Sequence, residues 1–161
     1  MKELIFISPG KDKPNIDGNF KTRLIYIDWK YKTITDLVDE VMPKIKGDII
    51  AGYSIGGTVA LILTQRLKLK KLILYSPSPL FKEKVNTLSN PALVVLGKRR
   101  LADAKTYSIK EIINDIKFPV EIYIGSKETK VMTDFAKYLN KRLENSSLIT
   151  KEGRSHNDLL I

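Results

Sequence analysis

Short apolar runs alternate with helix-length segments along this whole sequence, and no other feature limits the possible folds as much. The runs are rich in Ile, Leu, Val and Tyr, and most lack the polar–apolar alternation of a half-exposed sheet. Such runs are typical of parallel strands that are buried on both faces. Strands are therefore expected at Leu4–Ser8, Leu24–Asp28, Ile49–Tyr53, Lys71–Tyr75, Val120–Gly125 and Ser147–Thr150.

Helices are expected between these strands, at Ile34–Lys46, Ile55–Leu67, Pro91–Ala104, Ile109–Ile116 and Lys130–Glu144. Strands joined through helices form right-handed crossovers, which predicts a parallel six-stranded sheet in a three-layer α-β-α sandwich. Thr35 is predicted to cap the first helix, and Ser108 with Glu111 has the spacing of a capping box. Pro91 suits the first turn of its helix. The 161 residues contain no repeat or shift in composition, so a single domain over 1–161 is expected.

The segment Ala92–Gly97 is compatible with both a strand and a helix, because a short run of Val and Leu serves either state. We predict a helix there, since Lys98–Ala104 continues the segment without a break. This stretch belongs to the long connection between the fourth and fifth strands.

The pattern Gly52-x-Ser54-x-Gly56 marks the junction between a buried strand and an apolar helix. A serine on such a sharp turn carries its hydroxyl above the sheet edge, and small residues two before and two after allow the backbones to approach. The helix N-terminus directs amide groups and a partial positive charge toward Ser54. Two other readings remain: a glycine-rich turn that only links the elements, or one that holds a phosphate. The Gly-Lys-Ser/Thr sequence of a P-loop does not follow.

A base for Ser54 is available only from His156, the one histidine of the chain. It follows the last expected strand, so it lies at the sheet edge that also carries Ser54, where open parallel sheets bind ligands. Neutral imidazole has a pKa of about 6.5, which lets it accept the serine proton and return it near neutral pH. A purely structural role is the alternative for a lone histidine.

An acid is needed to orient the imidazole, and Glu128 is the favoured candidate because it follows the fifth strand at the same edge. Asp28 is the main rival, since it also ends a strand. Asp134 is expected to face solvent, and Asp158 is expected to cap the C-terminal turn.

Two backbone amides are expected to bind the oxyanion of a tetrahedral intermediate. One is the N–H of Ile55, which follows the nucleophile. The other comes from the loop after the first strand, where Pro9 has no N–H, so the donor is Lys11 or Gly10, with Lys11 preferred.

These motifs resemble the α/β-hydrolase superfamily, and among its members the small single-domain serine hydrolases. The resemblance rests on Gly52–Gly57, Gly125 with Glu128, Pro9-Gly10 and the late His156. It implies strand order 2-1-3-4-5-6, without the two N-terminal antiparallel strands of the full fold. Glu128 departs from the superfamily pattern, in which the orienting acid is more often an Asp. The connection 76–119 has room for only one or two helices, so a small lid, an open site and short or exposed esters are expected.

Composition excludes several other kinds of site. The chain has no Cys and one His, which removes disulfides, thiolate nucleophiles and Cys- or multi-His zinc sites. We therefore expect no metal and no cofactor.

No membrane span is expected, and residues 1–7 are too short and acidic for a signal peptide, so the protein is predicted to be cytoplasmic.

The net charge of +10 favours anionic partners through long-range attraction. The basic residues are scattered and no nucleic-acid motif accompanies them, so nucleic acid is not the expected partner. A group of cations is nevertheless expected in loops at the active edge: Lys11, Lys13, Lys127, Lys130 and Arg154. They suggest a negatively charged substrate, and the alternative is that they are ordinary residues of a basic surface.

The leading hypothesis is a serine hydrolase that cleaves a carboxylic ester or thioester through an acyl-enzyme on Ser54, with His156 as base and Glu128 as orienting acid. One alternative is a non-catalytic binding protein with a basic surface on the same fold. Another is an acyltransferase or peptidase that uses the same three residues.

Overall fold

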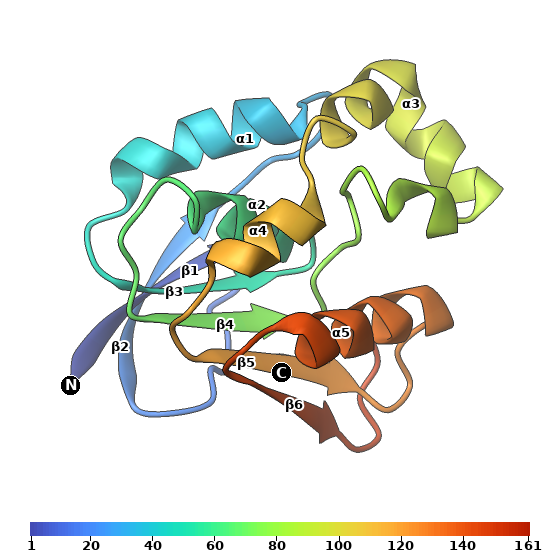
Figure 1. Ribbon diagram of the computed structural model, residues 1–161. Coiled ribbons are helices and arrows are strands. Elements are labelled where there is room, and N and C mark those ends of the chain that lie inside the picture. The colour runs from blue at the N-terminus through green and yellow to red at the C-terminus, as the bar shows by residue number, and fades with distance from the viewer.

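The computed structural model describes residues 1–161 and contains one parallel six-stranded sheet (Figure 1). Its strands are β1 (Lys2–Ser8), β2 (Phe20–Tyr26), β3 (Ile49–Tyr53), β4 (Lys71–Tyr75), β5 (Val120–Gly125) and β6 (Ser146–Lys151). Their spatial order is β2-β1-β3-β4-β5-β6, which confirms the predicted topology. The order reverses between β1 and β3, and in open parallel sheets ligands bind at such a reversal.

Five α-helices connect the strands: α1 (Ile34–Val41), α2 (Ile55–Leu63), α3 (Asn90–Ala104), α4 (Ile109–Asp115) and α5 (Lys130–Arg142). Two short 3-10 turns occur at Met42–Lys44 and Val85–Thr87. None of these helices combines the length and the apolar character needed to cross a membrane.

The main core lies between the helices and one face of the sheet. Ile5 and Ile7 of β1 point into this core, together with the buried faces of α1, α2, α4 and α5. The helix α2 is buried at all nine of its residues. Each helical connection leads in the direction from β2 toward β6, and right-handed crossovers in a single direction place all their helices on one face.

The other face of the sheet differs from the expected helical layer. Leu4 and Phe6 of β1 point to this side, where Leu159 is buried and Ile16 and Leu160 pack against them. Ile16 belongs to the loop after β1, whereas Leu159 and Leu160 belong to the C-terminal segment. The two segments are joined by a hydrogen bond from the Asn15 N–H to the Leu160 carbonyl (3.0 Å). The sheet is thus covered on both faces, but helices form only one of the layers. The β1–β2 connection alone leads in the opposite direction, and it contains no helix.

The strand β2 begins four residues before its predicted start, and it covers Phe20–Tyr26 instead of Leu24–Asp28. It is an edge strand that pairs only with β1, from Lys2 opposite Phe20 to Ser8 opposite Tyr26. Because an edge strand can expose alternate side chains, its polar first half gives no apolar run for sequence reasoning to detect.

The start of α1 also corrects a prediction. Thr33, not Thr35, is the N-cap: its hydroxyl accepts from the Asp36 N–H, while the Asp36 carboxylate accepts from the Thr33 N–H. Thr35 instead donates from its hydroxyl to Asp103 (2.6 Å) and so ties α1 to α3. Pro43 follows in the 3-10 turn, so α1 ends at Val41, before the predicted Lys46.

Of the segment Ala92–Gly97, residues Ala92–Leu96 are helical within α3, as predicted, but the helix does not continue into Lys98–Ala104 without a break. Pro91 occupies the first turn, and the Ser89 hydroxyl caps the helix. Gly97 has φ 77° and ψ 165°, which breaks the helix into two parts. The chain therefore changes direction after the first part, Asn90–Leu96, at a glycine, which can adopt a positive φ because it has no side chain.

Candidate active site

Ser54 lies on a strained turn between β3 and α2. Its φ is 55° and its ψ is −121°, values that are rare for a residue with a side chain. Three backbone hydrogen bonds hold the turn: Ser54 N–H donates to the Tyr75 carbonyl (3.0 Å), and the Ser54 carbonyl accepts from Gly57 (2.9 Å) and Ser78 (3.1 Å). The strain is therefore fixed by the surrounding backbone and places the hydroxyl at the carboxyl edge of the sheet.

The glycines of this motif are required by close packing. A Cβ on Gly52 would overlap the backbone of Gly56 and Gly57, and a Cβ on Gly56 would overlap the carbonyl of Ile7. The first contact joins the strand to its own helix, and the second presses α2 against β1. Only glycine fits at these two positions without a shift of the backbone.

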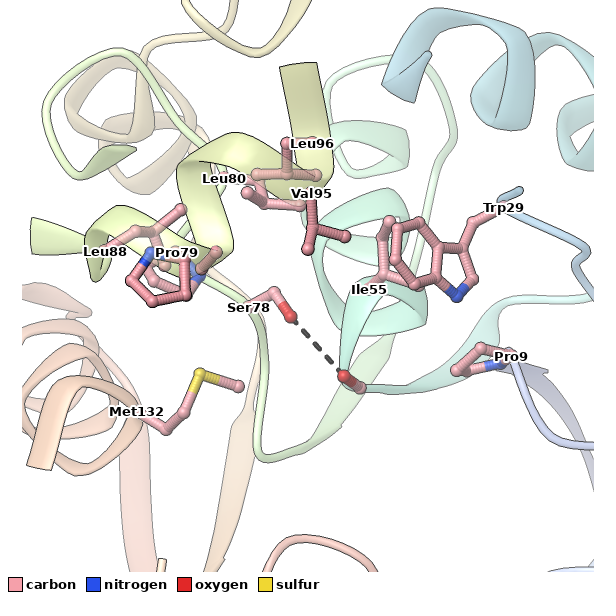
Figure 2. A pocket seen from close by; sticks show the side chains of 13 residues that line it. Pro9, Trp29, Ile55, Ser78, Pro79, Leu80, Leu88, Val95, Leu96 and Met132 are labelled. Carbon is pink, nitrogen blue, oxygen red and sulfur yellow. Dashed lines mark hydrogen bonds between the residues drawn. The ribbon is translucent and has the colours of Figure 1, made fainter. Parts of the chain in front are cut away.

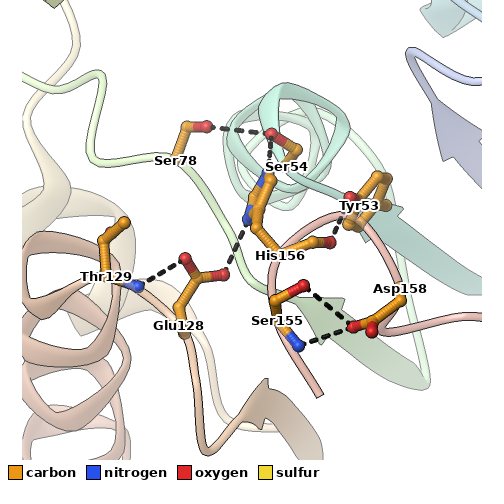
Figure 3. Close-up of polar contacts among 8 residues, drawn as sticks. All are labelled: Tyr53, Ser54, Ser78, Glu128, Thr129, Ser155, His156 and Asp158. Carbon is orange, nitrogen blue, oxygen red and sulfur yellow. Dashed lines mark hydrogen bonds and ion pairs between the residues drawn. The ribbon is translucent and has the colours of Figure 1, made fainter.

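His156 and Glu128 lie in line with Ser54 (Figure 3). The distance from Ser54 Oγ to His156 Nε2 is 3.0 Å, and that from His156 Nδ1 to Glu128 Oε2 is 2.7 Å. Residues 102 and 28 positions apart in the chain thus come within hydrogen-bond distance. They follow β3, β5 and β6, respectively, at the same edge of the sheet.

The protonation states of this group follow from the carboxyl group. Burial raises the pKa of Glu128, but hydrogen bonds from His156 and the Thr129 N–H outweigh this effect and hold the pKa below its usual value. A carboxylate can only accept, so His156 Nδ1 carries the proton and donates to it. In the neutral ring Nε2 is then an acceptor, and the Ser54 hydroxyl donates to it.

The environment of Glu128 differs from that of its partner. Its side chain is 0% exposed, whereas that of His156 is 28% exposed. The second carboxylate oxygen accepts from the Thr129 N–H at 2.8 Å. The acid is thus held by the N-cap residue of α5, while the imidazole remains accessible from solvent.

Tyr53 supports His156 in a way that the sequence did not reveal. Its ring stacks on the imidazole with centroids 5.2 Å apart, and its hydroxyl donates to the His156 carbonyl at 2.5 Å. Burial raises the pKa of Tyr53 to about 12, with the negative charges of Glu128 and Asp158 adding to the effect. The phenol therefore stays protonated and able to donate.

The rival carboxylates all lie in other environments. Asp28 is exposed and accepts from the Lys30 N–H (3.2 Å), and Asp134 pairs with Lys130 (2.6 Å) on the surface of α5. Asp158 accepts from the N–H (2.5 Å) and the hydroxyl (3.0 Å) of Ser155 and so shapes the turn that carries His156. Of the four candidates, only Glu128 contacts the imidazole.

The expected oxyanion donors are only partly positioned. Ile55 begins α2 directly after Ser54, where a helix leaves its first N–H groups without intrahelical partners. Gly10 already donates its N–H to the Ser8 hydroxyl (3.0 Å). Lys11 is exposed, and its N–H donates to no other group of the protein. Between these two loop amides, the one of Lys11 is free.

A cavity of about 380 Å³ opens beside Ser54 (Figure 2). Ile55 and Trp29 lie on one side of Ser78 in this view, and Met132 of α5 lies on the other. The first part of α3 closes the cavity opposite Ser54. The thirteen lining residues are Pro9, Trp29, Ser54, Ile55, Ser78, Pro79, Leu80, Leu88, Pro91, Ala92, Val95, Leu96 and Met132.

Ser78 is a second polar residue of this cavity that sequence reasoning missed. Its hydroxyl lies 3.4 Å from Ser54 Oγ, and its carbonyl accepts from the Thr58 hydroxyl at 2.7 Å. No sequence pattern singles out the stretch Ser76–Pro79, which follows β4. The proximity of Ser54 to the end of β4 was the available signal, because β3 and β4 are neighbours.

The cations expected at the active edge do not reach the cavity. Its walls include none of the five residues predicted from the sequence, namely Lys11, Lys13, Lys127, Lys130 and Arg154. Lys11 packs over the ring of Tyr26, with Nζ 5.0 Å from its centroid, and Lys130 pairs with Asp134. Nowhere in the chain do three side chains of His, Cys, Asp or Glu gather closely enough to hold a metal ion.

Comparison by sequence finds no matching protein-family model and no matching curated protein. Comparison by structure finds the same architecture in known proteins. The chain superposes on Est1E from Butyrivibrio proteoclasticus with a TM-score of 0.75 at 17% identity, covering 98% of this chain and 80% of that one. The esterase domain of a Rhodothermus marinus protein gives a TM-score of 0.71 at 14% identity, covering 98% and 79%.

A third similar structure is MGS-MChE2, described as an alpha/beta hydrolase enzyme from the metagenome of lagoon sediments at Mar Chica, Morocco. It gives a TM-score of 0.66 at 18% identity, covering 97% of this chain and 83% of that one. The sheet order, the sharp turn at Ser54 and these superpositions lead to one structural conclusion: this chain has the α/β-hydrolase fold.

Proposed function

We propose that this protein is a serine hydrolase that cleaves a carboxylic ester or thioester, with Ser54 as nucleophile, His156 as general base and acid, and Glu128 as the orienting acid. The observation that carries the proposal is the pair of distances at His156, 3.0 Å to Ser54 Oγ and 2.7 Å to Glu128 Oε2. A nucleophile, a base and a group that orients the base are the three parts that acyl transfer through serine requires. The similar structures named as esterases add support.

The first half of the reaction forms an acyl-enzyme. Ser54 Oγ attacks the carbonyl carbon as its proton passes to His156 Nε2, and the charge of the resulting imidazolium is balanced by the Glu128 carboxylate. The oxyanion accepts hydrogen bonds from the Ile55 N–H and from a loop amide after β1, for which Lys11 is the free candidate. The intermediate then collapses, and the leaving alcohol or thiol takes the proton from Nε2.

The second half returns the enzyme to its starting state. Water attacks the acyl carbon while His156 Nε2 accepts its proton, and a second tetrahedral intermediate forms at the same oxyanion site. On collapse the carboxylic acid leaves, and Ser54 Oγ takes the proton back. Because His156 is 28% exposed on its side chain, water has access to the base at this step.

The test is steady-state hydrolysis of p-nitrophenyl butyrate and of butyryl thiocholine by the native protein and by single variants. Ser54→Ala and His156→Ala should each lower kcat by roughly 10³-fold or more, because residues of such a set act as a unit. The exposed Ser147→Ala serves as a matched serine control and should keep native turnover. Native turnover in Ser54→Ala would contradict the proposal. The relative rates on the two substrates decide between ester and thioester.

A further inference from the structure

The cavity beside Ser54 is lined by uncharged and mostly apolar side chains. None of its thirteen lining residues carries an ionisable side chain, and the hydroxyls of Ser54 and Ser78 and the indole N–H of Trp29 are its only polar side-chain groups. A charged substrate group placed there would lose its hydration and find no counter-ion, which costs several kcal/mol. An apolar group would instead gain free energy in proportion to the area it buries.

The position of the cavity relative to His156 indicates which half of an ester it receives. His156 delivers its proton to the leaving group, so the alcohol or thiol must lie against the imidazole. The cavity is lined by Ser54 but by neither His156 nor Glu128. A group bound in it is therefore attached to the carbonyl on the acyl side.

The volume of the cavity sets the size of that group. If a cavity of about 150 Å³ holds benzene, each carbon needs roughly 25 Å³, and 380 Å³ accepts at most about fifteen carbons. Val95 lines the cavity and is nevertheless 66% exposed, so part of the volume borders on solvent. An acyl group that is covered on all sides must therefore be smaller than this limit of about fifteen carbons. A group of about six to ten carbons would fill roughly 150–250 Å³ at the same volume per carbon.

The outer wall of the cavity is one short helical segment, in which single residues can be substituted to test the cavity. Ala92, Val95 and Leu96 line the cavity from the part of α3 that precedes the break at Gly97 (Figure 2). Val94 belongs to the same turns but is 80% exposed and lies outside the lining. The two neighbouring positions thus allow a change inside the cavity to be compared with one outside it.

From these observations we infer that the cavity is an acyl-binding pocket that selects an uncharged, apolar acyl group of about six to ten carbons. The inference rests on the proposed function and adds to it the class of substrate. It also assigns the selectivity to the acyl half of the ester and leaves the alcohol half, on the solvent side of His156, weakly selected. It replaces both expectations from the sequence, a short acyl group and a negatively charged substrate.

The direct test measures kcat/KM for p-nitrophenyl acetate, butyrate, hexanoate, octanoate and decanoate. Each methylene that enters the pocket should raise kcat/KM by up to about fourfold, until the pocket is filled. A hexanoyl ester that ends in a carboxylate should react at least about a hundredfold more slowly than its uncharged counterpart. Methyl, butyl and hexyl butyrates, followed with a pH indicator, should differ far less than the acyl series.

A pair of variants locates the selectivity in the cavity. Ala92→Trp should fill part of the volume and move the optimum to a shorter acyl chain, while Val94→Trp should leave the optimum unchanged. The acyl series on the native protein tests the inference even if Ala92→Trp does not fold. Equal kcat/KM along the acyl series, or a steeper dependence on the alcohol, would overturn the inference. If Ser54 still reacts with a fluorophosphonate in that case, the proposed function stands and only the pocket assignment fails.

Discussion

The hydroxyl of Tyr53 donates a 2.5 Å hydrogen bond to the backbone carbonyl of His156, and the two rings stack at 5.2 Å. Tyr53 is the residue between Gly52 and Ser54, so the turn that carries the nucleophile also holds the loop that carries the base. The two catalytic candidates are thereby coupled through one side chain that does not itself line the cavity.

Tyr53→Phe should lower kcat by about fivefold while leaving KM nearly unchanged, because it removes one hydrogen bond of about 1 kcal/mol and keeps the stacked ring. Steady-state kinetics on p-nitrophenyl butyrate measure both constants. Since the pKa of Tyr53 is raised to about 12, the native kcat profile should show no loss from tyrosinate formation below about pH 10. Tyr31→Phe, at a tyrosine 76% exposed, is the control and should match the native enzyme. A purely structural role for Tyr53 would change stability but not kcat.

Glu128→Gln should lower kcat by roughly 10³-fold, because a neutral amide no longer stabilises the imidazolium and can select the wrong tautomer. Asp28→Asn should leave kcat unchanged, since Asp28 is exposed and bonded to the Lys30 N–H. Single-turnover and steady-state rates of both variants check this. A large loss in Asp28→Asn with a small one in Glu128→Gln would reverse the assignment of the acid.

Gly56→Ala should destabilise the protein by about 1–3 kcal/mol, because its methyl group overlaps the Ile7 carbonyl and forces α2 away from β1. Urea unfolding measures the change. Gly10→Ala is a control for stability alone, since its nearest neighbour would be Ser8 Oγ at 3.5 Å. Equal midpoints for the two variants would show that the space at Gly56 is not needed.

Glu83 caps α4 from a distant loop, and its titration should be visible in stability. Burial raises its pKa, but hydrogen bonds from the Ser108 hydroxyl and from the Lys110 and Ile109 N–H groups outweigh this and hold the pKa below its usual value. A lowered folded-state pKa stabilises the fold above the unfolded-state pKa, and the effect is lost as pH falls through the folded-state value.

Glu83→Gln should therefore cost about 1 kcal/mol near neutral pH, and the difference from the native protein should shrink below about pH 4.5. Chemical unfolding at a series of pH values measures it. Glu111→Gln on the same helix, whose side chain has no partner, is the matched control. A difference that grows on acidification would show the opposite shift.

The topology could be predicted from sequence because buried strands are recognisable as apolar runs. The bounds of β3, β4 and β5 agree with the prediction at both ends. The edge strand β2 was misplaced because its exposed side chains interrupt the run. The helical layer on the second face was also wrong, because neither segment that covers it has helical periodicity.

The candidate site was predictable to the extent that it depends on strand ends. Ser54, Glu128 and His156 each follow a strand of one parallel sheet, so their meeting at one edge follows from topology. Tyr53 was missed because its partner, the His156 carbonyl, depends on where the last loop returns, which sequence spacing does not encode. Ser78 was missed although it follows β4, the strand next to β3, so its place near Ser54 could have been predicted from the topology. The apolar cavity was missed for a related reason: its walls come from segments as distant as Pro9 and Met132.

The intact mass of the protein after exposure to a fluorophosphonate shows directly whether Ser54 is an activated nucleophile. We expect one adduct per chain, none in Ser54→Ala and a much slower reaction in His156→Ala, because only a serine activated by its imidazole reacts rapidly with this probe. A folded native protein that remains unlabelled, or one labelled equally in Ser54→Ala, would contradict the central claim that Ser54 is an activated nucleophile.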